Sequence, residues 1–228
     1  MIRQLTLDLP VRTAHGRDDF FVSPANAMAV AMIDAPDAWP EGKLLLLGPE
    51  GAGKSHLAAV WAGMAGATAV EATDLAGQSL PDLSSGGAVL VENAHLIADT
   101  PQNEAILFHL HNLLRASGGK LLLTATTPPA RWGLALPDLL SRMEGTATAT
   151  IATPDDALLA AVFLKLFADR QVQVAPGLVS YLIPRIDRSF SAVRTLVARL
   201  DARALALGRP VTRALAAEVL DSADKGAS

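Results

Sequence analysis

Leu44-Leu45-Leu46-Leu47-Gly48-Pro49-Glu50-Gly51-Ala52-Gly53-Lys54-Ser55 is an apolar run followed by a glycine-rich turn that ends in Gly-Lys-Ser. The run of leucines is typical of a strand buried on both faces of a parallel sheet, and residues 55–64 suit a helix. The turn between them matches the G-x-x-x-x-G-K-[ST] pattern, in which backbone N–H groups and a helix amino terminus hold phosphate oxygens. The stretch therefore predicts an α/β fold built around a phosphate-binding loop.

The pattern also assigns the contacts of this loop with a bound nucleotide. The residues expected to touch the nucleotide are Gly48, Pro49, Glu50, Gly51, Ala52, Gly53, Lys54, Ser55 and His56. Lys54 would reach the terminal phosphates, and Ser55 would place its hydroxyl on a Mg²⁺ ion. The alternative is an ordinary glycine turn, which the strand-loop-helix context disfavours.

The amino-acid composition is typical of a globular protein. The 228 residues are 50% hydrophobic and 18% charged, and they include no cysteine. No apolar run reaches the roughly 18 residues that a membrane helix needs, and the first residues lack a basic region followed by an apolar core, so a cytoplasmic protein without a secretory signal or membrane contact is expected. The net charge of −4 argues against a large non-specific nucleic-acid surface, so any contact with DNA is expected to be indirect.

Further apolar segments predict the rest of the sheet. The expected strands cover residues 67–72, 87–93, 120–124 and 146–151, and a helix is expected over residues 102–117. The strand at 87–93 ends in Glu92-Asn93, where nucleotide hydrolases carry an aspartate and a second acid. Glu92 can hold Mg²⁺ through water, but Asn93 has no basic carboxylate to activate the attacking water, so weak intrinsic hydrolysis is expected. Thr124 could sense the terminal phosphate, or could simply begin a loop.

Beyond residue 152 the pattern becomes purely helical. Helices are expected over residues 153–169, 176–183, 189–207 and 212–220, with no strand between them. The predicted organisation is an extended tail over residues 1–15, an α/β domain over 16–152, a helical lid domain over 153–221 and a frayed end over 222–228.

The first residues form a separate motif. Gln4 precedes leucines at positions 5, 7 and 9, and this alternation predicts an extended segment. It is compatible with an edge strand of the sheet or with a peptide that docks in an apolar groove of a partner.

Several stretches resemble the boxes of a known family of nucleotide hydrolases. Residues 20–26 are similar to the family's entry box beside the adenine, and residues 124–129 to its first sensor with trailing prolines. Residues 140–143 are similar to the arginine-finger box, and residues 192–196 to the second sensor. Together with the phosphate loop, their order over residues 18–220 resembles the AAA+ ATPases and, more closely, the DnaA branch of that family.

The resemblance implies a three-layer AAA+ sheet domain with a small helical lid that binds ADP or ATP with Mg²⁺. Phe21 and Val22 would lie near the adenine, Ser55 and Glu92 would hold the metal, and Thr124 and Arg194 would sense the phosphates. Arg142 would act as an arginine finger toward the nucleotide of another subunit. DnaA itself would continue into a DNA-binding domain, which is not expected here.

The first residues also resemble a known peptide motif. Gln4, Leu5, Leu7 and Leu9 resemble the hexapeptide by which bacterial replication proteins bind the DNA polymerase III sliding clamp, its beta subunit. The implied partners are that clamp, DNA through the clamp, and ATP-bound DnaA. The chain would promote hydrolysis of the ATP bound to DnaA. The alternatives are an AAA+ adaptor or helicase-loader-like protein that does not stimulate hydrolysis, and a self-sufficient ATPase; a homo-oligomer is also compatible.

Overall fold

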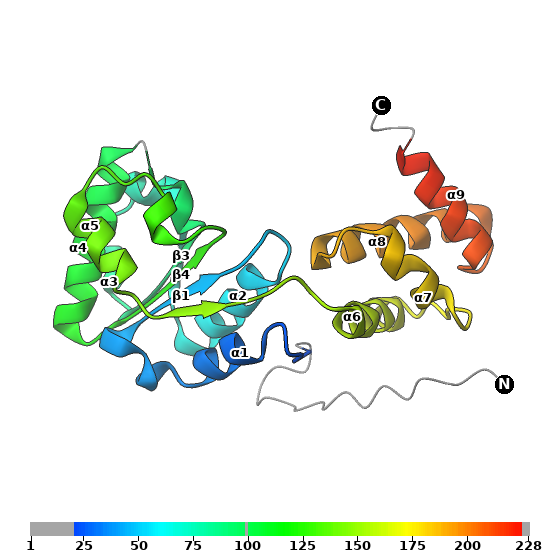
Figure 1. The fold of residues 1–228 in the computed structure, drawn as a ribbon, viewed down its shortest axis with the longest axis horizontal. Coiled ribbons are helices and arrows are strands. Elements are labelled where there is room, and N and C mark those ends of the chain that lie inside the picture. Colours follow the sequence, from blue (N-terminus) through cyan, green and yellow to red (C-terminus); the bar gives the residue numbers. More distant parts are fainter. Residues whose placement is uncertain (1–20, 99, 225–228) are drawn as a thin grey trace. The chain divides into compact units, whose positions relative to one another are not determined.

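The computed structural model describes residues 21–98 and 100–224. These residues divide into two compact units (Figure 1). Residues 24–152 form an α/β unit, whereas residues 21–23 and 153–224 form a helical unit. Within these ranges, no helix combines the length and the apolar character needed to cross a membrane.

A parallel sheet forms the centre of the α/β unit. Its strands are β1 (Lys43–Leu47), β2 (Thr68–Glu71), β3 (Ala88–Glu92), β4 (Lys120–Ala125) and β5 (Thr148–Thr150). The spatial order is β2-β3-β4-β1-β5, and every neighbouring pair is parallel. The strands expected from the sequence are confirmed, with small shifts at their ends. The carboxyl ends of all of them meet at one edge of the sheet, which is where the phosphate loop begins.

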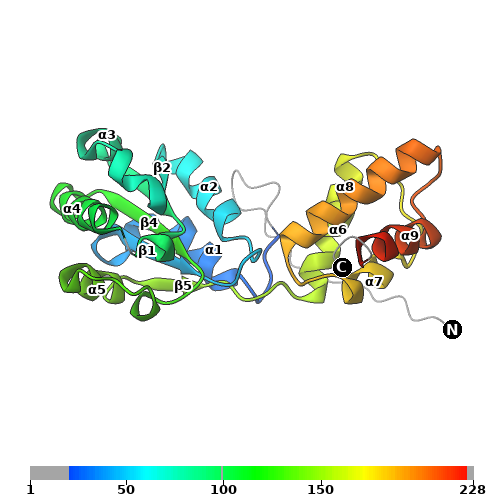
Figure 2. The ribbon, with the colours of Figure 1, turned by 90° about the horizontal axis from the view of Figure 1, so that it is seen from above.

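Helices cover both faces of this sheet (Figure 2). One face carries α1 (Ala27–Asp34) and α2 (Lys54–Ala65), and the other carries α3 (Leu80–Ser84), α4 (Pro101–Ser117) and α5 (Pro137–Glu144). Short 3-10 turns lie at Pro36–Ala38, Pro40–Gly42, Ala72–Gly77, Ala94–Leu96 and Pro129–Arg131. The predicted three-layer α/β architecture is therefore confirmed.

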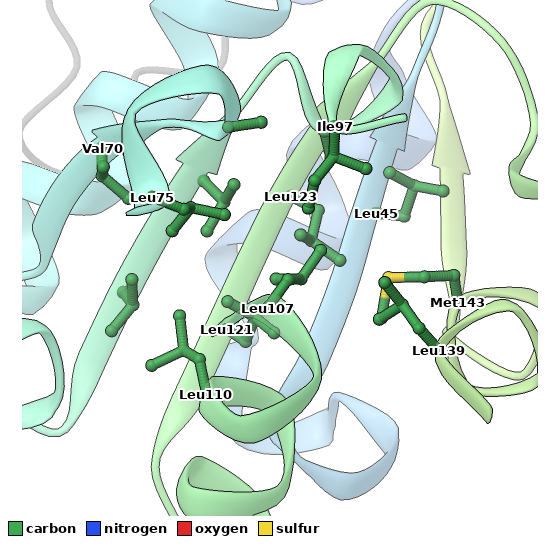
Figure 3. Close-up of a cluster of buried hydrophobic side chains, with 14 of the residues drawn as sticks. Leu45, Val70, Leu75, Ile97, Leu107, Leu110, Leu121, Leu123, Leu139 and Met143 are labelled. Atoms are coloured by element: carbon green, nitrogen blue, oxygen red, sulfur yellow. The ribbon is translucent and has the colours of Figure 1, made fainter. Parts of the chain in front are cut away.

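Alternation along the strands divides the core between the two faces. Leu45, Leu121 and Leu123 are fully buried and pack toward Leu107 and Leu110 of α4 (Figure 3). The strand residues between them are buried as well, under the opposite helix layer. Burial of each such leucine contributes roughly 1.5–3 kcal/mol, so the sheet is stabilised from both sides.

The helical unit has a core of its own. It contains α6 (Asp156–Asp169), α7 (Leu178–Leu182), α8 (Phe190–Leu207) and α9 (Arg213–Asp224), with a 3-10 turn at Ile183–Arg185. The Asp155 carboxylate accepts a 2.7 Å hydrogen bond from the Leu158 N–H and so caps α6. Ser189 caps α8 in the same way through the Ala192 N–H, at 3.0 Å. Helix α9 reaches into the segment from residue 222 that was expected to be frayed.

Candidate nucleotide-binding site

The phosphate loop joins the end of β1 to the start of α2. Gly51 and Gly53 adopt positive φ angles of 70° and 98°, which residues with a side chain adopt only at a cost. A Cβ atom at Gly48 would lie 2.3 Å from the Ile151 carbonyl oxygen, so only glycine fits there. The glycines of the motif are therefore explained by backbone conformation and by close approach to the segment after β5.

Lys54 lies over the loop. It is the first residue of α2, it is buried, and its Nζ donates hydrogen bonds to the carbonyl oxygens of Gly48 at 2.8 Å and Pro49 at 2.9 Å. Burial lowers the pKa of Lys54, and the carboxylates of Glu50 and Glu92 act against that shift. A phosphate group in the loop would supply oxygen acceptors and negative charge where the ammonium group already lies.

Ser55, Glu92 and Thr124 meet beside the loop. The hydroxyl groups of Ser55 and Thr124 both donate to Glu92 Oε2, at 2.8 Å and 3.1 Å. The Thr124 hydroxyl in turn accepts from the Asn93 N–H at 2.9 Å. The structure thus brings together three residues that the sequence singled out, from the start of α2, the end of β3 and β4.

Asn93 lies at the position where nucleotide hydrolases carry the second acid of the motif. Its backbone is left-handed, with φ 54° and ψ 41°, a conformation that asparagine tolerates better than most residues. Its side-chain Nδ2 donates to Glu71 Oε2 at 3.0 Å. Glu71 ends β2, and sequence reasoning missed it because nothing in the motif refers to that strand.

His95 is a second residue that sequence reasoning missed. Its Nδ1 is buried and has no hydrogen-bond partner among the described residues. Burial lowers its pKa, the Lys54 ammonium lowers it further, and Glu50 acts in the opposite direction. Burial thus favours the neutral form of the imidazole, and the position of His95 shortly after the acid-ended strand is the signal that could have drawn attention to it.

The donor set beside the loop suits Mg²⁺ held jointly with phosphate. In residues 21–98 and 100–224 there is no group of three or more histidine, aspartate or glutamate side chains that could hold a metal ion. Ser55 and Glu92 supply a hydroxyl and a carboxylate, and Mg²⁺ often takes its other ligands from phosphate and water.

The chain is similar in sequence and in fold to replication initiator proteins. No protein-family model matches the chain. The chromosomal replication initiator protein DnaA of Thermomicrobium roseum is 27% identical over 140 residues, which are 60% of this chain and 29% of that protein. Domain III of the Thermotoga maritima replication initiation protein DnaA has a TM-score of 0.78 at 16% identity, covering 93% of this chain and 98% of that one. This chain has the fold of a DnaA-like AAA+ domain.

The resemblance to the DnaA branch is therefore confirmed at the level of fold. A structure of AMPPCP-bound DnaA from Aquifex aeolicus has a TM-score of 0.65 at 17% identity and covers 78% of this chain and 62% of that one. This chain spans less than a third of the length of the Thermomicrobium roseum DnaA protein.

Arg142 lies in α5 of the DnaA-like domain, far from its own phosphate loop. Its half-buried guanidinium stacks over the Phe108 ring at 5.3 Å, and it lines a pocket that also includes Lys43, the first residue of β1. The loop begins after the last residue of β1, so about 16 Å of strand separates the two ends. Arg142 is thus at the opposite edge of the sheet from the loop.

The remaining predicted contact residues are divided between the α/β unit and the helical unit. His56 is exposed on α2, and Arg194 is exposed on α8 of the helical unit. Phe21 packs against the apolar core of the helical unit, and Val22 is half-buried beside it in the sequence. Their nucleotide contacts stay predictions. Gln4, Leu5, Leu7 and Leu9 lie outside the described residues.

A buried carboxylate fixes the start of α5. Glu104 of α4 is only 2% exposed, and its two oxygens accept hydrogen bonds from the N–H groups of Ala135 at 3.1 Å and Leu136 at 2.8 Å. These residues directly precede α5, so the carboxylate holds the backbone at the point where the helix begins. Sequence reasoning missed Glu104, because its partners lie about thirty residues away along the chain.

Replacing Glu104 by glutamine should destabilise the protein by about 2–3 kcal/mol. The amide keeps the shape but turns an NH₂ group toward a backbone N–H, and it loses charge-assisted hydrogen bonds in a buried place. Urea unfolding measures the loss, and Glu144→Gln on the exposed side of α5 is the control, with little change expected. Equal unfolding midpoints for both variants would contradict the assignment.

Proposed function

We propose that the chain binds ADP or ATP with Mg²⁺ in the loop over residues 48–55. The cluster in which Ser55 and Thr124 donate to one oxygen of Glu92, next to the buried Lys54, is the observation that carries this proposal. The DnaA structure with bound AMPPCP supports adenine as the base. The loop amides and Lys54 would hold the phosphates, Ser55 and Glu92 would hold the metal, and Phe21, Val22 and Arg194 would complete the site.

We propose further that the chain regulates the initiation of chromosome replication in the cytoplasm. Its action would be that of Hda, the regulatory inactivator of DnaA: the DNA-loaded sliding clamp recruits it through Gln4, Leu5, Leu7 and Leu9, and it promotes hydrolysis of DnaA-bound ATP. The position of Arg142 supports this proposal, because an arginine at the edge opposite its own loop does not reach the nucleotide there, and a finger that acts on another subunit does not need to. An arginine supplied in trans stabilises charge on the transferring phosphoryl group.

The same proposal gives the chain little hydrolysis of its own. Asn93 has no carboxylate that could accept a proton from the attacking water, and its amide is already bonded to Glu71. The nucleotide would then remain bound without being hydrolysed. Arg142 would act on the ATP bound to DnaA.

A second candidate is an AAA+ adaptor that binds a replication partner without stimulating hydrolysis. The exposed surface of α8 and the half-buried Arg142, stacked on Phe108, are compatible with such a role. In that case the nucleotide site is retained, whereas the guanidinium of Arg142 has no catalytic task.

Mixing the purified chain with sliding clamp, DNA and ATP-bound DnaA separates the candidates. The regulator should accelerate hydrolysis of DnaA-bound ATP only when clamp and DNA are both present, and the chain alone should hydrolyse ATP slowly. Alanine at Gln4, Leu7 and Leu9 should abolish clamp binding, because extended peptides depend on a few buried anchors. Brisk hydrolysis by the chain alone would favour the self-sufficient ATPase, and clamp binding without acceleration would favour the adaptor. If the alanine changes lower only the melting temperature, the tail is a strand of the sheet.

A further inference from the structure

A polar pocket of about 250 Å³ lies at the amino-terminal edge of the sheet. Segments far apart in the sequence line it: Glu41 from the turn before β1, Lys43 from β1, His111 and Arg115 from α4, and Arg142 from α5. Because the phosphate loop lies at the opposite edge, this pocket is separate from the nucleotide site.

Lys43 brings an unsatisfied ammonium group to this pocket. The residue is only 2% exposed, and its Nζ makes no hydrogen bond with any of the described residues. Its ion-pair contact with Glu41 Oε2 is 3.6 Å long, beyond hydrogen-bonding distance. Burial lowers the pKa of Lys43, Glu41 acts to raise it, and Arg115 and Arg142 lower it further. A buried ammonium with three donors and no acceptor is a group that an anion would satisfy.

His111 presents a second buried nitrogen without a partner. It is 3% exposed, and its Nδ1 has no hydrogen-bond partner among residues 21–98 and 100–224. Burial, with the charges of Lys43 and Arg142, lowers its pKa to about 4, whereas Glu41 and Asn112 act in the opposite direction. The imidazole is therefore neutral at pH 7, and its buried Nδ1 is left without a hydrogen-bond partner among the described residues.

The formal charge of the pocket is positive although the chain is acidic. Lys43, Arg115 and Arg142 face one carboxylate, that of Glu41, so the net formal charge is +2 on a chain of net charge −4. Glu41 has a positive φ of 52°, which costs a residue with a side chain. Its carboxylate is half exposed and also contacts Arg115 at 3.1 Å. The carboxylate thus compensates part of the charge from a strained position at the rim.

We propose that this pocket is a second phosphate site, which binds an inorganic phosphate dianion through Lys43, His111, Arg115 and Arg142. A dianion matches the net charge, and its four oxygens match the ammonium and guanidinium donors of the side chains that line the pocket. A volume of about 250 Å³ accommodates phosphate together with several waters. The proposal concerns this chain alone and stands whether or not the chain acts on DnaA.

The test uses the full chain carrying Lys54→Ala, so that the phosphate loop does not compete for the probe. Inorganic phosphate should raise the thermal midpoint in a concentration-dependent way, because a ligand that binds only the folded state stabilises it. Acetate at the same ionic strength should not. In proton NMR at pH 8, where inorganic phosphate is mainly the dianion, added phosphate should shift the His111 ring signals, because the anion would bind beside the imidazole; His111→Gln assigns them.

Lys43→Met in the same background separates binding from stability. Methionine fills the space without a buried charge, so the variant should fold at least as stably in phosphate-free buffer and yet lose the response to phosphate. Lys165→Met, which removes a lysine of the helical unit that pairs with Asp169, should keep the full response. A Lys43→Met protein that still responds, a wild-type His111 signal that phosphate leaves unmoved, or an equal response to acetate would each overturn the proposal.

Discussion

Replacing Arg142 with alanine should lower the stimulated hydrolysis of DnaA-bound ATP by a factor on the order of 10³ or more, the range measured for arginine fingers supplied in trans. The variant should still fold. The lost stacking on Phe108 costs on the order of 0.5–1 kcal/mol, and removal of one cation from the crowded pocket offsets part of it. Nucleotide and clamp binding should be unchanged, because Arg142 lies at the sheet edge opposite the loop. The measurement is single-turnover hydrolysis by DnaA in the mixture with clamp and DNA.

Two further variants make this expectation specific. Arg142→Lys should recover little, because lysine keeps the charge but lacks the planar fork that spans two phosphoryl oxygens and stacks on an aromatic ring. Arg131→Ala, at an exposed arginine of the same unit, should stimulate as the wild type does. Full stimulation by Arg142→Ala would remove the finger assignment and favour the adaptor, and loss of folding would make the arginine structural.

Replacing Lys54 with alanine should weaken ATP and ADP binding roughly 10²-fold, about 3 kcal/mol, because charge-assisted hydrogen bonds to phosphate are lost. The cost to folding should be smaller. Burial already disfavours the charged form of Lys54, although the carbonyl oxygens of Gly48 and Pro49 lose their donor. Isothermal titration of the purified variant measures the affinity, with Lys165→Ala as the control. Unchanged affinity for both nucleotides would show that binding does not depend on this loop.

Local patterns account for what the sequence predicted well. A leucine run that ends in a Gly-Lys-Ser turn is compatible with few folds, and the strand at 87–93 and its neighbour at 120–124 followed from apolar runs of strand length. The start of α1 shows where local patterns are less specific. Ser23 and Pro24 are typical of a helix start, yet Asn26 is the N-cap and the helix begins at Ala27. Preferences at helix starts leave such shifts open when several capping residues follow one another.

The residues that sequence reasoning missed all act over long distances along the chain. Glu71 meets Asn93 because β2 and β3 are paired, and Glu104 meets the residues before α5 because two helices pack together. The pocket around Lys43 was hidden for the same reason, since its cations come from one strand and two helices. Spacing along a sequence encodes neighbours on one helix or strand, whereas these contacts depend on tertiary packing.

Strand β1 has a proposed phosphate site at each of its ends. Its residues pair with β4 along one side and with β5 along the other, and the first four are buried. The two proposed sites share no side chain, and changes more than about 10 Å apart with no shared partners usually contribute independently to stability. Binding at one end should therefore change the ligand affinity at the other end very little. The protein would then respond to nucleotide and to free phosphate as two independent signals.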